Sequence, residues 1–144
     1  MEERDTAELL KEVDSGCHMA VSSFEQVEKF DLSHDLMNVL QKSEKCHREI
    51  EKEAEDMLRE LGEDEKNPNP ITRAMSWLTT EVKLNVKEDA NQVAKLMMDG
   101  CNTGIQSISE AISKYPSASD KSVKLARKLI QSEENFMDEM KEYL

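Results

Sequence analysis

The sequence predicts an all-α fold, a four-helix bundle made of two antiparallel hairpins. Apolar residues recur at the spacing of an amphipathic helix in four long segments. Only four Gly and three Pro interrupt the 144 residues, of which 38% are hydrophobic and 35% charged. This balance is typical of long helices with solvated outer faces. The length suits one domain that spans residues 1–144.

The first hairpin is predicted over residues 6–30 and 34–61. Asp5 is expected to cap the first helix, because Glu8 follows three residues later as in a capping box. A short connection at residues 31–33 leads into the second helix, which Ser33 is expected to cap. Gly62 supplies the left-handed residue that ends this helix.

The second hairpin is predicted over residues 90–115 and 120–144. Asp89 is expected to cap its first helix, and Pro116 ends that helix before the short connection at 117–119. The four expected helices are about 25 to 28 residues long, or roughly 37 to 42 Å. Helices of equal length suit side-by-side packing in a bundle.

The connection between the hairpins, about residues 62–89, determines the topology. A crossover of that length spans the height of a bundle, which makes the second and third helices parallel, as in the ferritin-like arrangement. Asn69-Pro70 predicts the start of a short helix within the crossover. Its apolar residues Met75, Trp77 and Leu78 suit either a lid on the bundle or a surface for a partner or a second copy.

Charge and cysteine content limit the classes of function and location. The formal charge is −12, from 31 acidic and 19 basic residues, and such a surface repels phosphate backbones and anionic lipid headgroups. We therefore expect neither nucleic-acid binding nor membrane binding. The N-terminus lacks the pattern of a signal peptide, and no apolar run is long enough to span a membrane. Three cysteines without a secretory signal indicate reduced thiols in the cytoplasm.

A polar layer at mid-height of the bundle is the clearest candidate for chemistry. Glu44 and His47 have the i, i+3 spacing that places a carboxylate and an imidazole on one helical face, as in metal sites inside bundles. Counted from the hairpin turns, Cys17 and Glu133 should lie level with His47. Glu44, His47, Glu133 and Cys17 are therefore candidate ligands of one iron, manganese or zinc ion.

A dinuclear carboxylate site is not expected, because it needs a second Glu-x-x-His motif and Phe136 stands where its histidine would be. The layer also has a structural interpretation. Glu44 would then pair with a protonated His47 or with a Lys or Arg that reaches in, and Glu133 would accept hydrogen bonds from Ser43 or from a thiol. No catalytic residue is predicted, since a Cys–His pair inside helices has no free amides for an oxyanion.

The sequence resembles an uncharacterised bacterial family of ferritin-like four-helix-bundle domains with a degenerate metal site. The resemblance covers nearly the whole chain and is carried by the runs 44–47, 61–64, 73–78 with Pro70 before it, and 98–104. It implies a ferritin-like fold and no reaction. We therefore expect a non-catalytic bundle that acts through protein contacts or as a homo-oligomer, with a mononuclear Glu/His metal site as the alternative.

Overall fold

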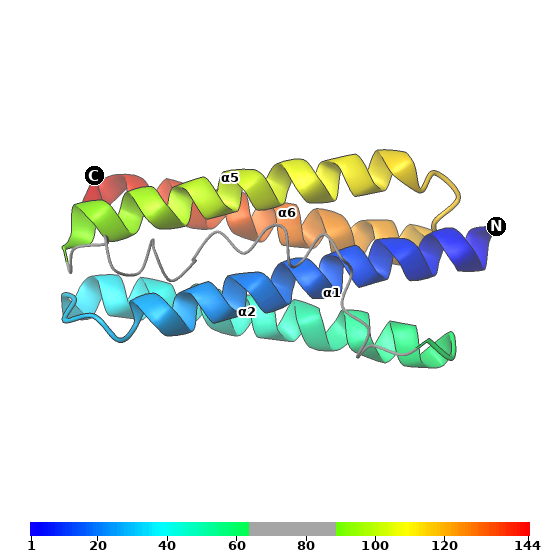
Figure 1. Ribbon diagram of the computed structural model, residues 1–144, viewed down its shortest axis with the longest axis horizontal. Coiled ribbons are helices and arrows are strands. Elements are labelled where there is room, and N and C mark those ends of the chain that lie inside the picture. The colour runs from blue at the N-terminus through cyan, green and yellow to red at the C-terminus, as the bar shows by residue number, and fades with distance from the viewer. Residues whose placement is uncertain (64–88) are drawn as a thin grey trace.

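The computed structural model describes residues 1–63 and 89–144, which form an all-helical four-helix bundle (Figure 1). The helices are α1 (Glu2–Val27), α2 (His34–Glu60), α5 (Ala90–Lys114) and α6 (Asp120–Met140), and a 3₁₀ turn, η1 (Lys141–Tyr143), follows α6. The predicted short helix of the crossover lies outside the described residues. None of the described helices is long and apolar enough to cross a membrane.

Three of the predicted caps are confirmed. The side chains of Ser33 and Asp89 accept hydrogen bonds from the backbone N–H groups at the starts of α2 and α5, at 3.2 Å and 2.8 Å. Ser119, for which no cap was predicted, caps α6 in the same way. Gly62 has a φ of 75° directly after α2, as expected of a glycine that ends a helix.

The expected cap at Asp5 is wrong, because α1 begins at Glu2 and includes this residue. The carboxylate of Asp5 instead accepts a hydrogen bond from the backbone N–H of Ser117, at 2.9 Å. The hydroxyl of Thr6 accepts one from Ser119, at 2.8 Å. The first turn of α1 therefore binds the loop between α5 and α6, a long-range contact that sequence spacing does not reveal.

The helices pair as the two predicted hairpins. α1 lies beside α2 and α5, and α6 lies beside α2 and α5. Figure 1 shows that α2 and α5 run in the same direction, so that the end of α2 and the start of α5 lie at opposite ends of the bundle.

The core consists of two clusters of buried apolar side chains. One cluster, which we call the lower cluster, gathers residues such as Leu10, Val13 and Leu129 near the N-terminus of α1. The other, which we call the upper cluster, includes Phe24, Leu40 and Phe136. The rings of Phe24 and Phe136 meet edge to face, with 5.1 Å between their centroids. The buried polar side chains include His47 and Glu133, which form one of the two sites described next.

Candidate functional site

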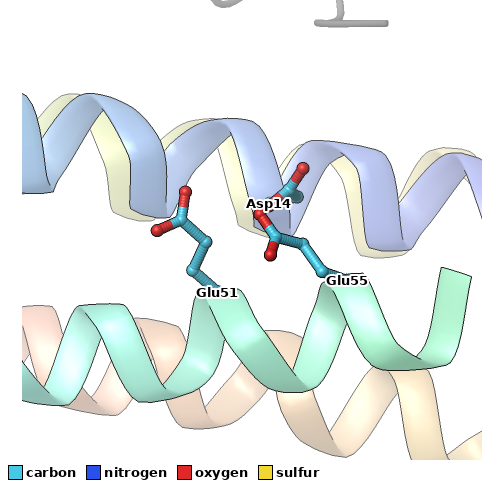
Figure 2. Close-up of side chains that lie close together, drawn as sticks. All are labelled: Asp14, Glu51 and Glu55. Carbon is cyan, nitrogen blue, oxygen red and sulfur yellow. The ribbon is translucent and has the colours of Figure 1, made fainter. Parts of the chain in front are cut away.

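Two groups of charged side chains are candidates, and the more exposed one lies on the seam between α1 and α2. Figure 2 shows Asp14 of α1 facing Glu51 and Glu55 of α2. Their ligand oxygens all lie within 4.8 Å of one another, and no other described set of three metal-ligating side chains is as compact. We call this group the acidic seam. His18 Nδ1 lies 3.4 Å from a carboxylate oxygen of Glu51 at its edge.

The acidic seam is only partly shielded from solvent. Partial burial, and then the neighbouring charge of Glu55, raise the pKa of Glu51, while His18 opposes the rise. This group was not predicted from the sequence, although its signal is present there. Asp14 and His18 are four residues apart on α1, and Glu51 and Glu55 are four apart on α2, so that each pair shares a helical face.

The second group lies inside the bundle and begins with His47 on α2. The residue is 1% exposed, and its Nδ1 lies 2.8 Å from the backbone carbonyl oxygen of Ser43. A carbonyl oxygen can only accept, so Nδ1 carries the proton and donates this hydrogen bond. In a neutral ring the other nitrogen, Nε2, therefore presents its lone pair. A backbone carbonyl that fixes the tautomer in this way is typical of histidines that bind metals.

Glu133 on α6 faces that lone pair. Its Oε1 lies 3.6 Å from His47 Nε2, and the side chains are 1% and 6% exposed for His47 and Glu133. This distance is too long for a hydrogen bond. The second carboxylate oxygen, Oε2, is buried and has no hydrogen-bond partner. Burial raises the pKa of Glu133, and the neighbouring His47 partly counteracts the rise.

A small cavity of about 40 Å³ adjoins the pair, and Gly100, Cys101 and Gly104 of α5 form part of its wall. An added Cβ at Gly104 would lie only 2.6 Å and 2.9 Å from the two carboxylate oxygens of Glu133. The glycine therefore makes the space in which the carboxylate lies. The cavity has room for an ion with a water molecule or two. We call His47, Glu133 and this cavity the interior site.

The structure brings together two of the four predicted ligands, His47 and Glu133. The expectation that Glu44 faces the core beside His47 is wrong. The side chain of Glu44 is 15% exposed and pairs with Arg48 at 2.8 Å, and Arg48 in turn reaches Glu25 at 2.6 Å. The reason is geometric. Three helical residues turn by about 300°, so a carboxylate three positions before a centrally placed histidine points about 60° away, toward the α1–α2 seam.

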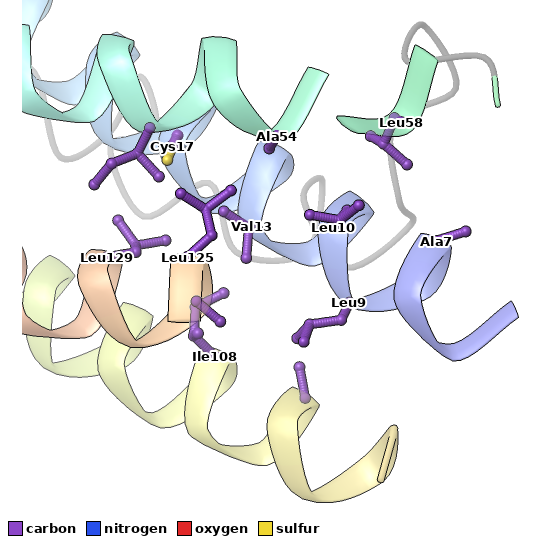
Figure 3. Close-up of a cluster of buried hydrophobic side chains, with 13 residues drawn as sticks. Ala7, Leu9, Leu10, Val13, Cys17, Ala54, Leu58, Ile108, Leu125 and Leu129 are labelled. Atoms are coloured by element: carbon purple, nitrogen blue, oxygen red, sulfur yellow. The ribbon is translucent and has the colours of Figure 1, made fainter. Parts of the chain in front are cut away.

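Cys17 lies in the lower cluster, where Figure 3 shows its sulfur among aliphatic side chains that include Val13 and Leu129. It is fully buried and is not among the described residues that line the interior cavity. Cys101, which was not among the predicted ligands, does line it. Burial, and then the charge of Glu133, raise the pKa values of both thiols.

Met75, Trp77 and Leu78, the predicted partner surface, lie outside the described residues. The large hydrophobic residues that the described part of the chain exposes are Met1, Leu61 and Leu144. Leu61 follows α2, and the other two are the chain ends. They do not form one continuous apolar face.

The described residues thus form a helical bundle with a buried histidine–carboxylate pair beside a small cavity. The fold is similar to that in the crystal structure of a DUF305 fragment from Deinococcus radiodurans, with a TM-score of 0.69. The match covers 96% of this chain and 93% of that one, at 14% sequence identity. At this identity the likeness is one of fold alone. No protein-family model matches the sequence, and no curated protein matches it.

Proposed function

We propose that the protein is a ferritin-like helical bundle that binds one divalent transition-metal ion between His47 and Glu133. The observation that carries the proposal is the buried carboxylate of Glu133, whose Oε2 has no hydrogen-bond partner and whose Oε1 faces His47 Nε2 at 3.6 Å. A buried polar atom without a partner is costly unless something absent from the protein satisfies it.

Four species relieve the contact between the Nε2 lone pair and a carboxylate: a proton on the ring, a proton on the carboxyl group, a water molecule that donates to both, or a cation between them. A water molecule that donates to both would hold the two atoms farther apart, at about 4.4 Å. Either proton would draw the two atoms to hydrogen-bond distance and still leave Oε2 without a partner. A tetrahedral ion with ligand distances of about 2.0–2.2 Å holds its ligands about 3.3–3.6 Å apart. The observed 3.6 Å is close to that separation, and the cavity supplies room for bound water.

The ferritin-like part of the proposal is supported by the direction of the helices. α2 and α5 run parallel while each hairpin is antiparallel, as expected of a bundle with one long crossover (Figure 1). A dinuclear site does not fit, because Phe136, 1% exposed, occupies the position of the second histidine. We therefore propose metal binding without oxygen activation. Action through protein contacts stays a prediction, because the predicted partner surface at Met75, Trp77 and Leu78 lies outside the described residues.

Elemental analysis tests the proposal. The protein is purified without a metal-binding tag from a metal-replete culture and washed with excess Mg²⁺, which competes for carboxylate-only sites such as the acidic seam but poorly for imidazole. We expect close to one equivalent of iron, manganese or zinc, its loss in His47→Ala and Glu133→Gln, and its retention in the matched surface variant His34→Gln. A metal-free wild-type protein that also fails to take up added Zn²⁺ would contradict the proposal.

A further inference from the structure

We propose that Cys101 supplies a thiolate as the third protein ligand of the interior site, which would make the site selective for zinc-class ions. This inference rests on the proposed function and deepens it by naming the class of metal. It departs from the sequence-based ligand set in two ways, because Cys101 replaces Cys17 and Glu44 has no part in it.

The first observation is the position of Cys101. It lies on α5, 6% exposed, in the wall of the same cavity as His47 and Glu133. Gly104 follows three residues later on α5 and leaves open the space beside the carboxylate of Glu133. Three helices thus each contribute one ligand type to a single cavity: imidazole from α2, carboxylate from α6 and thiol from α5.

The second point is that rotation of the Cys101 side chain can bring its sulfur closer to the pair. In the structure, the ligand atoms of His47, Glu133 and Cys101 are not all within 4.8 Å of one another, unlike those of the acidic seam. A helical cysteine has two favoured χ1 rotamers, and a change between them moves the sulfur by about 3 Å. The cavity beside Cys101 provides room for the movement, and a zinc–sulfur bond needs the sulfur about 2.3 Å from the ion.

The third point is the net charge of a bound ion and its ligands. A divalent ion bound only by a neutral His47 and an ionised Glu133 would leave a net charge of +1 inside the bundle, and an uncompensated buried charge is strongly unfavourable. When the thiol of Cys101 binds, its S–H bond breaks, a metal–sulfur bond forms and one proton leaves to solvent. Two negative ligands then balance the ion. A set of imidazole, thiolate and carboxylate favours Zn²⁺ and Co²⁺ over Mg²⁺ and Ca²⁺.

Cobalt absorption tests the inference. The reduced, metal-free protein is titrated with Co²⁺ in the presence of excess Mg²⁺, and near-ultraviolet thiolate-to-cobalt charge transfer is recorded together with the visible d–d bands. We expect charge transfer in the wild-type protein and in Cys46→Ser, a matched control whose thiol is only partly buried. In Cys101→Ser we expect charge transfer to disappear and affinity to fall on the order of 10–100-fold, the loss that even outer-shell partners cause.

The possible outcomes separate the two proposals. Co²⁺ binding with d–d bands but no charge transfer would overturn the role of Cys101 and leave the metal site at His47 and Glu133 standing. No Co²⁺ binding by equilibrium dialysis would overturn both. If Cys101→Ser does not fold, Cys17→Ala decides between the two remaining thiols. Charge transfer that persists in Cys17→Ala and in Cys46→Ser supports Cys101, and its loss in Cys17→Ala overturns the assignment.

Discussion

The acidic seam and the interior site both place charged side chains of different helices close together, yet their surroundings differ. In the seam, three carboxylates gather within 4.8 Å and are partly exposed. In the interior site, a single carboxylate faces a single imidazole, and both are almost fully buried. Water and salt can compensate the first group but not the second. If the proposed function is correct, burial rather than the number of ligands distinguishes the group that needs a bound ion from the group that solvent can compensate.

Removal of the interior pair should have the largest effect on stability. In the double variant His47→Leu/Glu133→Met, the free energy of unfolding of the metal-free protein should rise by about 1–4 kcal/mol, because apolar side chains of similar volume replace a buried polar pair. Urea unfolding monitored by circular dichroism measures this change. A clear loss of stability would show that the pair holds the fold together, and the contrast with the seam would fail.

Substitution at Gly104 should weaken Zn²⁺ binding with little change in the free energy of unfolding. In Gly104→Ala, the new methyl group would lie 2.6 Å from a carboxylate oxygen of Glu133 and displace it. We expect Zn²⁺ affinity to fall at least about tenfold, while the higher helix propensity of Ala, about 1 kcal/mol, offsets the strain. Gly16→Ala is the matched control, since Gly16 lines the same cavity but its added Cβ would meet only ordinary contacts at 3.6 Å and 3.7 Å, away from Glu133. Calorimetric titration of both variants compares them, and equal affinities would contradict the assigned site.

A change in the acidic seam should have a small, salt-dependent effect. In Glu55→Gln, loss of one of the crowded carboxylates should stabilise the protein by about 0.2–1 kcal/mol at low ionic strength. The gain should vanish in 1 M salt, where the screening length is about 3 Å. Thermal unfolding at the two salt concentrations tests this. A gain that persists in high salt would mean that the seam is as sheltered as the interior site.

The smallest expected effect concerns Glu28 at the end of α1. Burial, and then a hydrogen bond with Glu44, raise the pKa of Glu28 from 4.5 to about 8. The folded state therefore holds this proton more tightly than the unfolded state, so its contribution to stability is full below pH 4.5 and is lost as the pH rises through 8. Because solvent screens the group, we expect Tm to be lower by only about 1–2 °C above pH 8 than below pH 4.5 as a result of Glu28. The difference should be absent in Glu28→Gln, and an equal pH dependence in that variant would assign it elsewhere.

Much of the fold could be predicted because it depends on local signals. Ser33, Asp89 and Gly62 act on residues next to them in sequence, and the helical spacing of apolar residues identifies the buried faces. The cap at Asp5 failed because its carboxylate binds Ser117, more than a hundred residues away.

The site could be predicted only in part. Counting residues from the hairpin turns placed His47 level with Glu133, and the two side chains do meet. The same count gives height but not direction around each helix axis. It therefore could not tell that Glu44 turns toward Arg48. Nor could it tell that Cys101, rather than Cys17, borders the cavity.

The most direct test of the interior site is a nitrogen-15 NMR spectrum of the histidine rings before and after one equivalent of Zn²⁺ is added to the metal-free protein in excess Mg²⁺. We expect that His47 carries its proton on Nδ1 throughout and that only its Nε2 resonance shifts on addition of Zn²⁺. The rings of His18, beside the acidic seam, and of His34 should remain unchanged. A His47 ring that does not respond to Zn²⁺, or a response confined to His18, would contradict the account.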